Sequence, residues 1–267
     1  MNYFSSLPLK QYDIEKNKKY RTVSDLGRRV GIRSDISDII PAYYKASISS
    51  SERPEVLAYE LYNNSEYHWV LLQLNNVVDP YYDWILEDYT FDDFLKKKYP
   101  NMGLLLESDH FGANSYNNSD PKKHFFYPGE IVKAEVGSGD GDQSGAEGTV
   151  IEFNPTIRQL IYTHVSGTFI NGEVITGQNS SAISKIESYI SEEMNAIHHY
   201  ESIAPTETGL VVGRAYEVTY GTTSYASTPI TNQLYELNRN EEQREISVLN
   251  SNYVQQYINE FKEKVSQ

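Results

Sequence analysis

The segment Ser65–Leu74, SEYHWVLLQL, constrains the fold of this chain most strongly. Its apolar residues follow the helical pattern i, i+3, i+4, i+7: Tyr67, Val70, Leu71 and Leu74. Trp69 and Leu72 lie on the other side of the same predicted helix. A helix that is apolar all round must be covered all round. We therefore expect another segment, from this chain or from another one, to pack against Trp69 and Leu72.

The flanking residues predict a small unit around this helix. A preceding helix is predicted at Pro54–Asn63, because proline is tolerated in a first helical turn and Glu55 complements the positive end of the helix dipole. Tyr43–Ser50 is predicted to be a strand, and Asn75–Trp84 to be a turn with a second strand. A strand–helix–helix–strand unit of roughly 45 residues is near the lower size limit for independent folding.

The rest of the chain changes character twice. A helix is predicted at 90–99 and a polar loop at 107–124. From Phe125, short apolar runs separated by Gly, Pro and Asn favour a small antiparallel barrel or sandwich. The chain closes with a strand-like run and an amphipathic helix that has Tyr253, Tyr257 and Phe261 on one face. No long-range repeat is evident.

Charge is distributed unevenly. Residues 1–33 hold eight bases and three acids, a net charge of +5. Because the whole chain has a net charge of −14, the remaining residues carry −19. The acidic body disfavours nucleic acid as a partner, and no apolar run approaches the ~20 residues needed to cross a membrane. The basic arm is typical of docking onto acidic protein, such as another copy of this chain, and a solvated tail is the alternative.

The composition bears on compartment and contacts. The chain has no cysteine, which excludes disulfides and thiolate metal sites and favours assembly in a reducing cytoplasm. The N-terminus lacks the pattern of a secretory signal. The 23 tyrosines suit protein interfaces, because tyrosine offers a large contact area with a polar tip.

Two groups of residues could hold a metal, and we favour structural interpretations of both. Residues 139–148, GDGDQSGAEG, place Asp140, Asp142 and Ser144 at the 1, 3, 5 spacing of a calcium loop, but position 12 is Ile151 where glutamate is required. A glycine-rich hairpin loop is the better interpretation.

The second group is His198–His199 with Glu201. Adjacent residues on a strand face opposite ways and are not expected to converge on one ion. No motif of a hydrolase or of a phosphate-binding loop is present, so we expect no enzymatic activity, no catalytic residue, no cofactor and no metal.

The residues RPEVLAYELYNNSEYHWVLLQLNNVVDPYYDW (53–84) strongly resemble the signature of the baseplate wedge subunits of T-even-type contractile-tailed bacteriophages, the gene-53-product family. The stretches NYFSSLPLKQYDI, DLGRRVGIRSDI and ITNQLYELNRNEEQREISVLNSNYVQQYINEF also resemble that family. The residues at 125–190 depart from the short members, which have no such insertion.

The resemblance implies a non-enzymatic, structural role in the virion. The protein would bind other baseplate wedge proteins and link adjacent wedges in the tail baseplate, assembled in the host cytoplasm in six or a multiple of six copies. It also implies a LysM-like βααβ module.

The predicted fold class is thus α+β, a LysM-like module plus an inserted small antiparallel β-barrel or sandwich. The predicted parts are an extended basic N-terminal arm with one short helix near Val23–Val30 (1–41), the LysM-like module (42–90), a helix and linker loop (91–124), the β module (125–190) and a C-terminal strand and amphipathic helix region (191–267).

The alternative function is binding of N-acetylglucosamine polymers of the cell wall, as LysM modules elsewhere do. The sugar groove would lie between the loops Ser49–Pro54 and Asn75–Tyr81. The surplus apolar helix surface favours permanent burial against protein instead. We expect only other virion components to shield that surface, whereas the alternative is that both tryptophans belong to the core. The interface candidates are Arg53, Pro54, Tyr67, Trp69, Leu72, Asp79, Pro80, Tyr81, Tyr82, Trp84, Tyr253, Tyr257 and Phe261.

Overall fold

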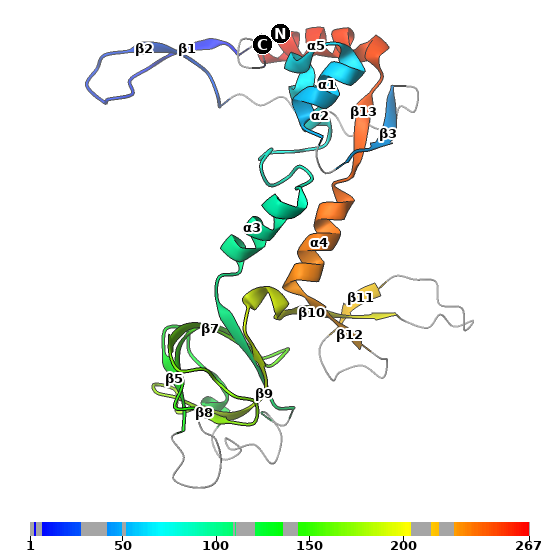
Figure 1. The fold of residues 1–267 in the computed structure, drawn as a ribbon. Coiled ribbons are helices and arrows are strands. Elements are labelled where there is room, and N and C mark those ends of the chain that lie inside the picture. Colours follow the sequence, from blue (N-terminus) through cyan, green and yellow to red (C-terminus); the bar gives the residue numbers. More distant parts are fainter. Residues whose placement is uncertain are drawn as a thin grey trace. The chain divides into compact units, whose positions relative to one another are not determined.

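The computed structural model describes residues 3, 7–27, 42–49, 52–108, 110, 121–135, 144–203, 215–218 and 227–266. They form two compact units (Figure 1). The first, here the split unit, combines Met1–Phe91 with Arg239–Gln267, and the second, the inserted unit, is Asp92–Asn238. The two segments of the split unit are therefore separated in sequence by the whole inserted unit.

Two helices of the split unit match the prediction. Helix α1 (Pro54–Tyr62) has its proline in the first turn, and it ends at Asn63, whose left-handed backbone (φ +54°) lets its N–H bond to the Tyr59 carbonyl at 2.8 Å. A 3₁₀ turn, η2 (Ser65–Tyr67), leads into α2 (His68–Leu74). The Asn64 side chain caps this turn by accepting a hydrogen bond from the Glu66 N–H at 2.9 Å.

The sheet of the split unit joins the two ends of the sequence. Strand β3 (Tyr43–Ser47), which confirms the first predicted strand, pairs antiparallel with β13 (Glu245–Leu249), so that Ser47 lies opposite Glu245. The strand predicted within Asn75–Trp84 is wrong, because this segment forms turns. Its aspartates bind backbone N–H groups that a strand would need for its ladder.

The split unit covers its own apolar helix. Trp69 is 6% exposed, and its ring lies 5.6 Å from that of Tyr3, 6.0 Å from that of Tyr257 and 4.8 Å from that of Phe261. The last two belong to helix α5 (Ser251–Ser266). Leu72 is half-buried beside a second apolar cluster around Leu71 and Trp84. The expectation that only other virion components could shield this surface is therefore wrong.

A hairpin follows the N-terminal contacts with this core. Leu7 is buried in the Trp69 cluster, and strands β1 (Leu9–Tyr12) and β2 (Arg21–Ser24) then pair antiparallel. The short helix predicted near Val23–Val30 is wrong at its start, since Val23 and Ser24 belong to β2, and residues 28–30 lie outside the described residues.

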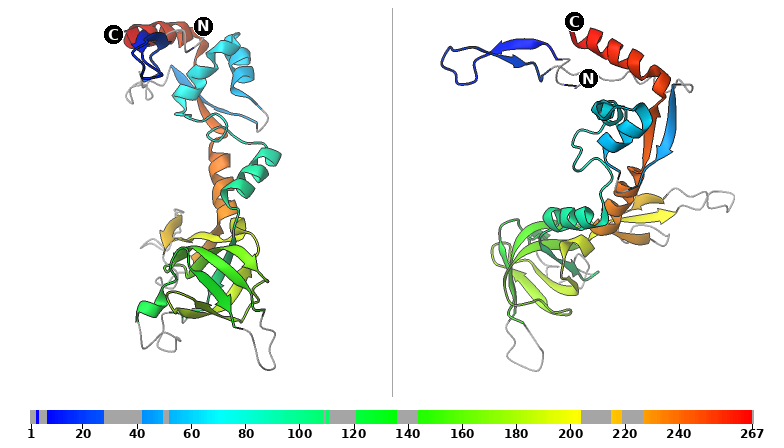
Figure 2. Two further views of the ribbon diagram at one scale, coloured as in Figure 1. Left: turned by 90° about the vertical axis from the view of Figure 1, so that its left-hand side faces the viewer. Right: turned by 45° about the horizontal axis from the view of Figure 1, so that its top comes forward.

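A closed, six-stranded antiparallel barrel dominates the inserted unit (Figure 2). This confirms the predicted barrel and excludes the sandwich. The strand order around the barrel is β4-β7-β6-β5-β8-β9. The strands are β4 (Met102–Leu106), β5 (Ile131–Ala134), β6 (Glu147–Asn154), β7 (Gln159–Ser166), β8 (Val174–Gly177) and β9 (Ile183–Ile190). The segment predicted as a helix and linker does contain the predicted helix, α3 (Asp88–Lys98), but it also contains β4, which was not predicted. Leu104 and Leu106 of this strand are fully buried in the barrel core.

The remaining elements of the chain are helices and a small sheet. Helices α3 (Asp88–Lys98) and α4 (Asn232–Glu242) each contain a boundary between the units. The three-stranded sheet has the order β11-β10-β12, and short 3₁₀ turns complete the inserted unit. These elements are β10 (Ile197–Ile203), β11 (Ala215–Val218), β12 (Ser227–Thr231), η3 (Pro121–His124) and η4 (Glu193–Asn195). Within the described ranges, no helix has the length and apolar character to cross a membrane.

The same local motif occurs in the parts of the barrel built on β5–β6 and on β8–β9, here called its two halves, although the sequence shows no evident long-range repeat. Glu130 follows Gly129 (φ +85°) and precedes β5, and Glu173 follows Gly172 (φ +88°) and precedes β8. Each glycine adopts a backbone conformation that other residues rarely take. Both glutamates are buried.

The buried glutamate of each half binds a serine in the loop of the other half. Glu130 accepts hydrogen bonds from the backbone N–H and the Oγ of Ser180, each at 2.9 Å, in the loop of the second half. Glu173 accepts hydrogen bonds from the backbone N–H and, at 2.9 Å, the Oγ of Ser144 in the loop of the first half. Each serine Oγ also accepts a hydrogen bond from the N–H two residues further on, at 3.1 Å. We call these two contacts the glutamate latches.

Candidate interaction surface

The loop Val78–Asp83, here the tyrosine loop, is held rigid by its own aspartates. Asp83 Oδ2 accepts hydrogen bonds from the backbone N–H of Asp79 at 3.0 Å and of Val78 at 3.2 Å. Asp79 Oδ1 accepts one from the Tyr81 N–H at 3.0 Å, and the Asp83 N–H donates to the Asp79 carbonyl at 2.7 Å. Short polar side chains that bond to nearby backbone groups define such turns. Asp79 therefore shapes the loop.

The loop presents apolar and aromatic side chains to solvent. Val78 is 79% exposed, Tyr81 is 81% exposed and Tyr82 is 53% exposed. Tyrosine gives a large contact area at a low cost in conformational entropy, and rigid tyrosines are enriched in protein interfaces. The arrangement is suited to binding another protein.

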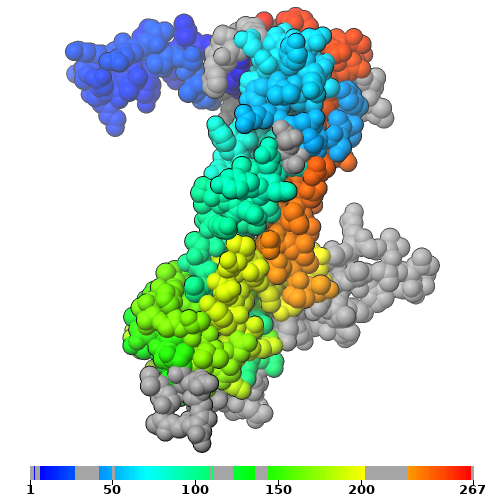
Figure 3. Space-filling view, viewed as in Figure 1, coloured from blue at the N-terminus to red at the C-terminus, as the bar shows by residue number. Residues whose placement is uncertain are grey.

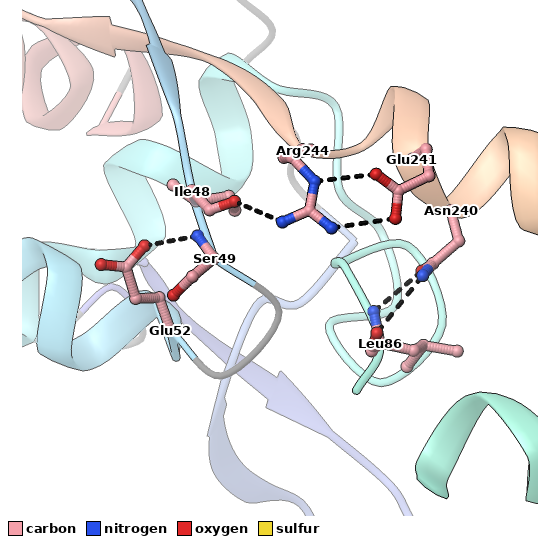
Figure 4. A network of polar contacts seen from close by, with 7 residues as sticks. All are labelled: Ile48, Ser49, Glu52, Leu86, Asn240, Glu241 and Arg244. Carbon is pink, nitrogen blue, oxygen red and sulfur yellow. Dashed lines mark hydrogen bonds and ion pairs between the residues drawn. The ribbon is translucent and has the colours of Figure 1, made fainter. Parts of the chain in front are cut away.

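Buried residues anchor the C-terminal side of the loop. Trp84 is 5% exposed, and its indole Nε1–H donates to the Glu52 carbonyl at 2.8 Å. The backbone of Leu86 is paired in both directions by the side chain of Asn240, whose Oδ1 accepts from the Leu86 N–H at 2.8 Å and whose Nδ2 donates to the Leu86 carbonyl at 3.2 Å (Figure 4). Asn240 of α4 thus fixes the backbone three residues after the tyrosine loop.

The same C-terminal stretch fixes the end of β3. Arg244 binds Glu241 through two hydrogen bonds, of 2.8 Å from Nε and 2.9 Å from a terminal nitrogen, and its other terminal nitrogen donates to the Ile48 carbonyl at 3.2 Å (Figure 4). The hydrogen bond to Arg244 lowers the pKa of Glu241, and the same bond raises the pKa of Arg244. Next to this pair, Glu52 Oε2 accepts from the Ser49 N–H at 2.8 Å.

The predicted interface residues separate by exposure. The buried ones are Pro54, Trp69, Trp84 and Phe261; the half-buried ones are Tyr67, Leu72, Asp79 and Tyr257; the exposed ones are Arg53, Pro80, Tyr81, Tyr82 and Tyr253. The tryptophans therefore belong to the core of this chain, as the alternative interpretation had it. The exposed residues stay candidates for contact with another protein.

Sequence reasoning missed several exposed or structurally important residues of the split unit. Val56 and Tyr59, on the outer face of α1, are exposed, and their spacing of three residues could have signalled a second apolar face. The side chains of Asn75 and Asn240 form hydrogen bonds with backbone groups more than 150 residues away in the sequence. No local sequence pattern marks either residue.

His198 and His199 do not face opposite ways, as neighbours on a regular strand are expected to do. His198 Nδ1 lies 2.8 Å from His199 Nδ1, and His199 Nε2 lies 3.0 Å from Glu201 Oε1. The pairing of β10 with β12 shifts register between Ile197 and His199, and this irregularity turns the two rings toward each other. The His198 ring also stacks on Tyr235 at 3.9 Å.

Metal ligands are not assembled in the part of the chain that the structure describes: no group of three or more His, Cys, Asp or Glu side chains there is placed to hold an ion. Of the calcium-like loop, Asp140 and Asp142 lie outside the described residues, and Ser144 is engaged by Glu173.

Comparison with known proteins agrees with the resemblance seen in the sequence. The family described as Base plate wedge protein 53 matches residues 10–120. The chain is also similar to the baseplate wedge protein gp53 of Enterobacteria phage T4, with 43% identity over 73 residues, which is 26% of this chain and 37% of that protein. The chain thus spans about a third of the length of the curated relative it matches. The resemblance to baseplate wedge subunits is confirmed over residues 10–120, which contain α1, α2 and the tyrosine loop.

Proposed function

We propose that this chain is a structural component of a phage tail baseplate wedge, present in the virion, where it joins neighbouring wedge proteins during assembly in the host cytoplasm. The match of residues 10–120 to the wedge protein family carries the proposal. The resemblance further suggests six or a multiple of six copies per baseplate. In this role the chain acts by adhesion and has no catalytic step.

The tyrosine loop supports this proposal, because it combines exposure with rigidity. A loop whose backbone is already held in place loses little entropy on binding, so the area that it buries contributes more to affinity. Tyr81 and Tyr82 are both exposed on such a support, and aromatic side chains of this kind carry a large share of the binding energy in many interfaces.

The test is co-purification of the tagged full chain with the other wedge proteins of the same phage. Wild-type chain is expected to recover one or more of them in stoichiometric amounts. The double variant Tyr81→Ala/Tyr82→Ala is expected to reduce that recovery at least about tenfold. Tyr127→Ala, which removes a half-exposed tyrosine of the inserted unit, is the matched control. Recovery of no wedge protein by the wild-type chain would contradict the proposal.

We also propose that the LysM-like module is assembled from both ends of the sequence. Its first strand and two helices would be β3, α1 and α2, and its second strand would be β13 rather than the segment after α2. The antiparallel pairing of β3 with β13 supports this arrangement.

Sugar binding by this module has less support. The Glu52 carbonyl, in one loop of the expected groove, is engaged by Trp84, and Asn75, in the other, by Ser247. We expect the full chain to show no saturable binding in a peptidoglycan pull-down. Saturable binding that competes with N-acetylglucosamine oligomers would restore the alternative.

A further inference from the structure

The N-terminal hairpin has almost no core of its own. All four residues of β1 are exposed, and so are Ile14 and Tyr20 in the connecting loop. Two-stranded hairpins alone in water are at best marginally stable. Exposed apolar side chains on such an element indicate that another surface covers it in the assembled state.

One face of the hairpin is both basic and aromatic. Lys10 lies opposite Val23 and Tyr12 opposite Arg21, and residues directly opposite in an antiparallel pair share a face. Residues 9–24 hold five bases and two acids, a net charge of +3. The hairpin, in blue, is uncovered on the face that Figure 3 shows.

The two acids of the hairpin are used internally. Asp13 accepts hydrogen bonds from the backbone N–H groups of Asn17 at 3.1 Å and Lys18 at 2.7 Å, and Glu15 pairs with Arg21 at 3.1 Å. The lysines at 10, 16, 18 and 19 are exposed. The positive charge of the hairpin is therefore available to an acidic partner.

A surface of matching chemistry exists on the same chain. Residues 78–89, VDPYYDWILEDY, hold four acids and no base. They include the tyrosine loop, and Glu87, Asp88 and Tyr89 next to it are exposed. The two surfaces thus complement each other in charge, and both offer tyrosines.

We propose that the basic face of the N-terminal hairpin of one copy docks onto residues 78–89 of a second copy, which makes a head-to-tail contact between chains. Complementary charges steer such an encounter and fix its register, and the exposed aromatic side chains of both surfaces are buried by it. A contact between two different surfaces of one chain is heterologous, so it propagates from copy to copy and closes into a ring when the rotation allows. The inference rests on the proposed function only in using the tyrosine loop as a contact surface.

Sedimentation velocity of the purified full chain over a concentration series tests the contact. The wild-type chain is expected to self-associate in a concentration-dependent manner below about 100 μM, as expected of weak specific contacts. Raising the salt from about 0.05 M to about 0.5 M shortens the screening length roughly threefold and should weaken the association. Tyr12→Ala and Tyr81→Ala should each weaken it about tenfold or more.

A charge exchange makes the test specific. Lys10→Glu and Glu87→Lys each alter an exposed side chain, and each variant alone should self-associate less than the wild-type chain. Mixing the two variants restores opposite charges at both kinds of contact, so association should return in the mixture. Gln11→Glu, on the opposite face of β1, is the matched control and should have a smaller effect than Lys10→Glu.

The outcomes separate this inference from the proposed function. Loss of association in both variants with recovery in the mixture supports the head-to-tail contact. A wild-type chain that stays monomeric throughout the series overturns it, as does an association that neither variant changes. If wedge proteins still co-purify with the chain in either of the last two cases, the proposed function stands while the inference falls.

Discussion

Asn75 closes the outer edge of strand β13 by pairing with Ser247, 172 residues further along the chain. Its Oδ1 accepts a hydrogen bond from the Ser247 N–H at 2.7 Å, and its Nδ2 donates to the Ser247 carbonyl at 3.0 Å. The side-chain amide thereby takes the place that the peptide group of a third strand would occupy. Its Nδ2 also donates to the Leu71 carbonyl at 2.8 Å, which ties the sheet to the end of α2.

Asn75→Asp should destabilise the chain more than Asn75→Ala. A carboxylate cannot donate to the Ser247 carbonyl or the Leu71 carbonyl. One of its oxygens would instead face these two carbonyl oxygens, which are also acceptors. We expect a loss of about 2–3 kcal/mol for the aspartate and about 1–2 kcal/mol for the alanine, the usual range for a lost pair of partly buried hydrogen bonds. Urea unfolding of the full chain measures both, and Asn76→Asp, at the exposed neighbouring position, serves as control. Equal effects at both positions would argue against the pairing.

The two tryptophans should respond differently to replacement by phenylalanine. The Trp84 indole N–H donates to the Glu52 carbonyl at 2.8 Å, whereas Trp69 Nε1 has no hydrogen-bond acceptor among the described residues. Trp84→Phe therefore leaves a partly buried carbonyl without its donor, at a cost of about 1–3 kcal/mol beyond the loss of ring area, and Trp69→Phe loses ring area alone. Chemical unfolding of both variants decides this, with Trp69→Ala and Trp84→Ala as references. A larger loss for Trp69→Phe than for Trp84→Phe would contradict the prediction.

Local patterns in the sequence predicted the local elements well. Pro54, with its fixed φ, marks the start of α1, and the spacing of Val70 and Leu71 places α2 with its apolar side inward. The runs after Phe125 similarly predicted short strands in a barrel or sandwich, since each run is bounded by turn residues that break the pattern.

The pairing of distant segments could not be predicted in the same way. Nothing near Tyr43 in the sequence indicates that its strand pairs with Glu245–Leu249, whereas the aromatic stretch after α2 is much closer in sequence. The cover of Trp69 comes from Tyr257 and Phe261, which the sequence did mark as an apolar helix face, although not which surface that face would meet.

The shared motif of the two halves does not appear as a sequence repeat because their loops differ in length. Glu130 and Ser144 are 14 residues apart, whereas Glu173 and Ser180 are seven apart. The shared signal is the dipeptide Gly-Glu before an apolar strand, followed by a serine two residues before a buried alanine. The contact between each glutamate and the serine of the other half arises only when the barrel is folded, so the sequence does not reveal it.

The glutamate latches should be sensitive to loss of charge. The Glu130 carboxylate accepts hydrogen bonds from Tyr127, Asn179 and Ser180, and an amide would direct two hydrogens at these donors. We expect Glu130→Gln to lower the free energy of unfolding by about 2–4 kcal/mol, because hydrogen bonds to a charged acceptor contribute more than neutral ones. Glu173→Gln should have an effect of the same kind in the other half.

The matched control for the latches is Glu152→Gln, an exposed glutamate of β6. Guanidinium unfolding of the three variants should give a clear loss for Glu130 and Glu173 and a change within about 0.5 kcal/mol for Glu152. Latch variants as stable as the control would show that the exchanged carboxylates do not hold the barrel together.

His110 should make the stability of the chain depend on pH near neutrality. Its ring is buried against Phe126 and Phe153, and its Nε2 lies 2.7 Å from the His124 carbonyl. Burial lowers the pKa of His110 below its ordinary value of 6.5, and repulsion from His124 and Arg158 adds to this. The unfolded chain therefore binds a proton more readily than the folded chain once the pH falls below about 6.5.

This difference in pKa has a defined sign. The contribution of neutral His110 to the free energy of unfolding is complete above the pKa of about 6.5 in the unfolded chain. It is lost as the pH falls from there toward the lowered pKa in the folded chain, by at most about 1.4 kcal/mol per pH unit. His110→Gln cannot take up the proton, and its free energy of unfolding should fall less than that of the wild-type chain between pH 7.5 and pH 5.5. His164→Gln, at an exposed position of β7, should keep the wild-type dependence. Urea unfolding at both pH values gives the comparison, because the wild-type chain and His110→Gln share every titrating group other than His110. Parallel losses in the wild-type chain and in His110→Gln would show that His110 does not govern the pH dependence.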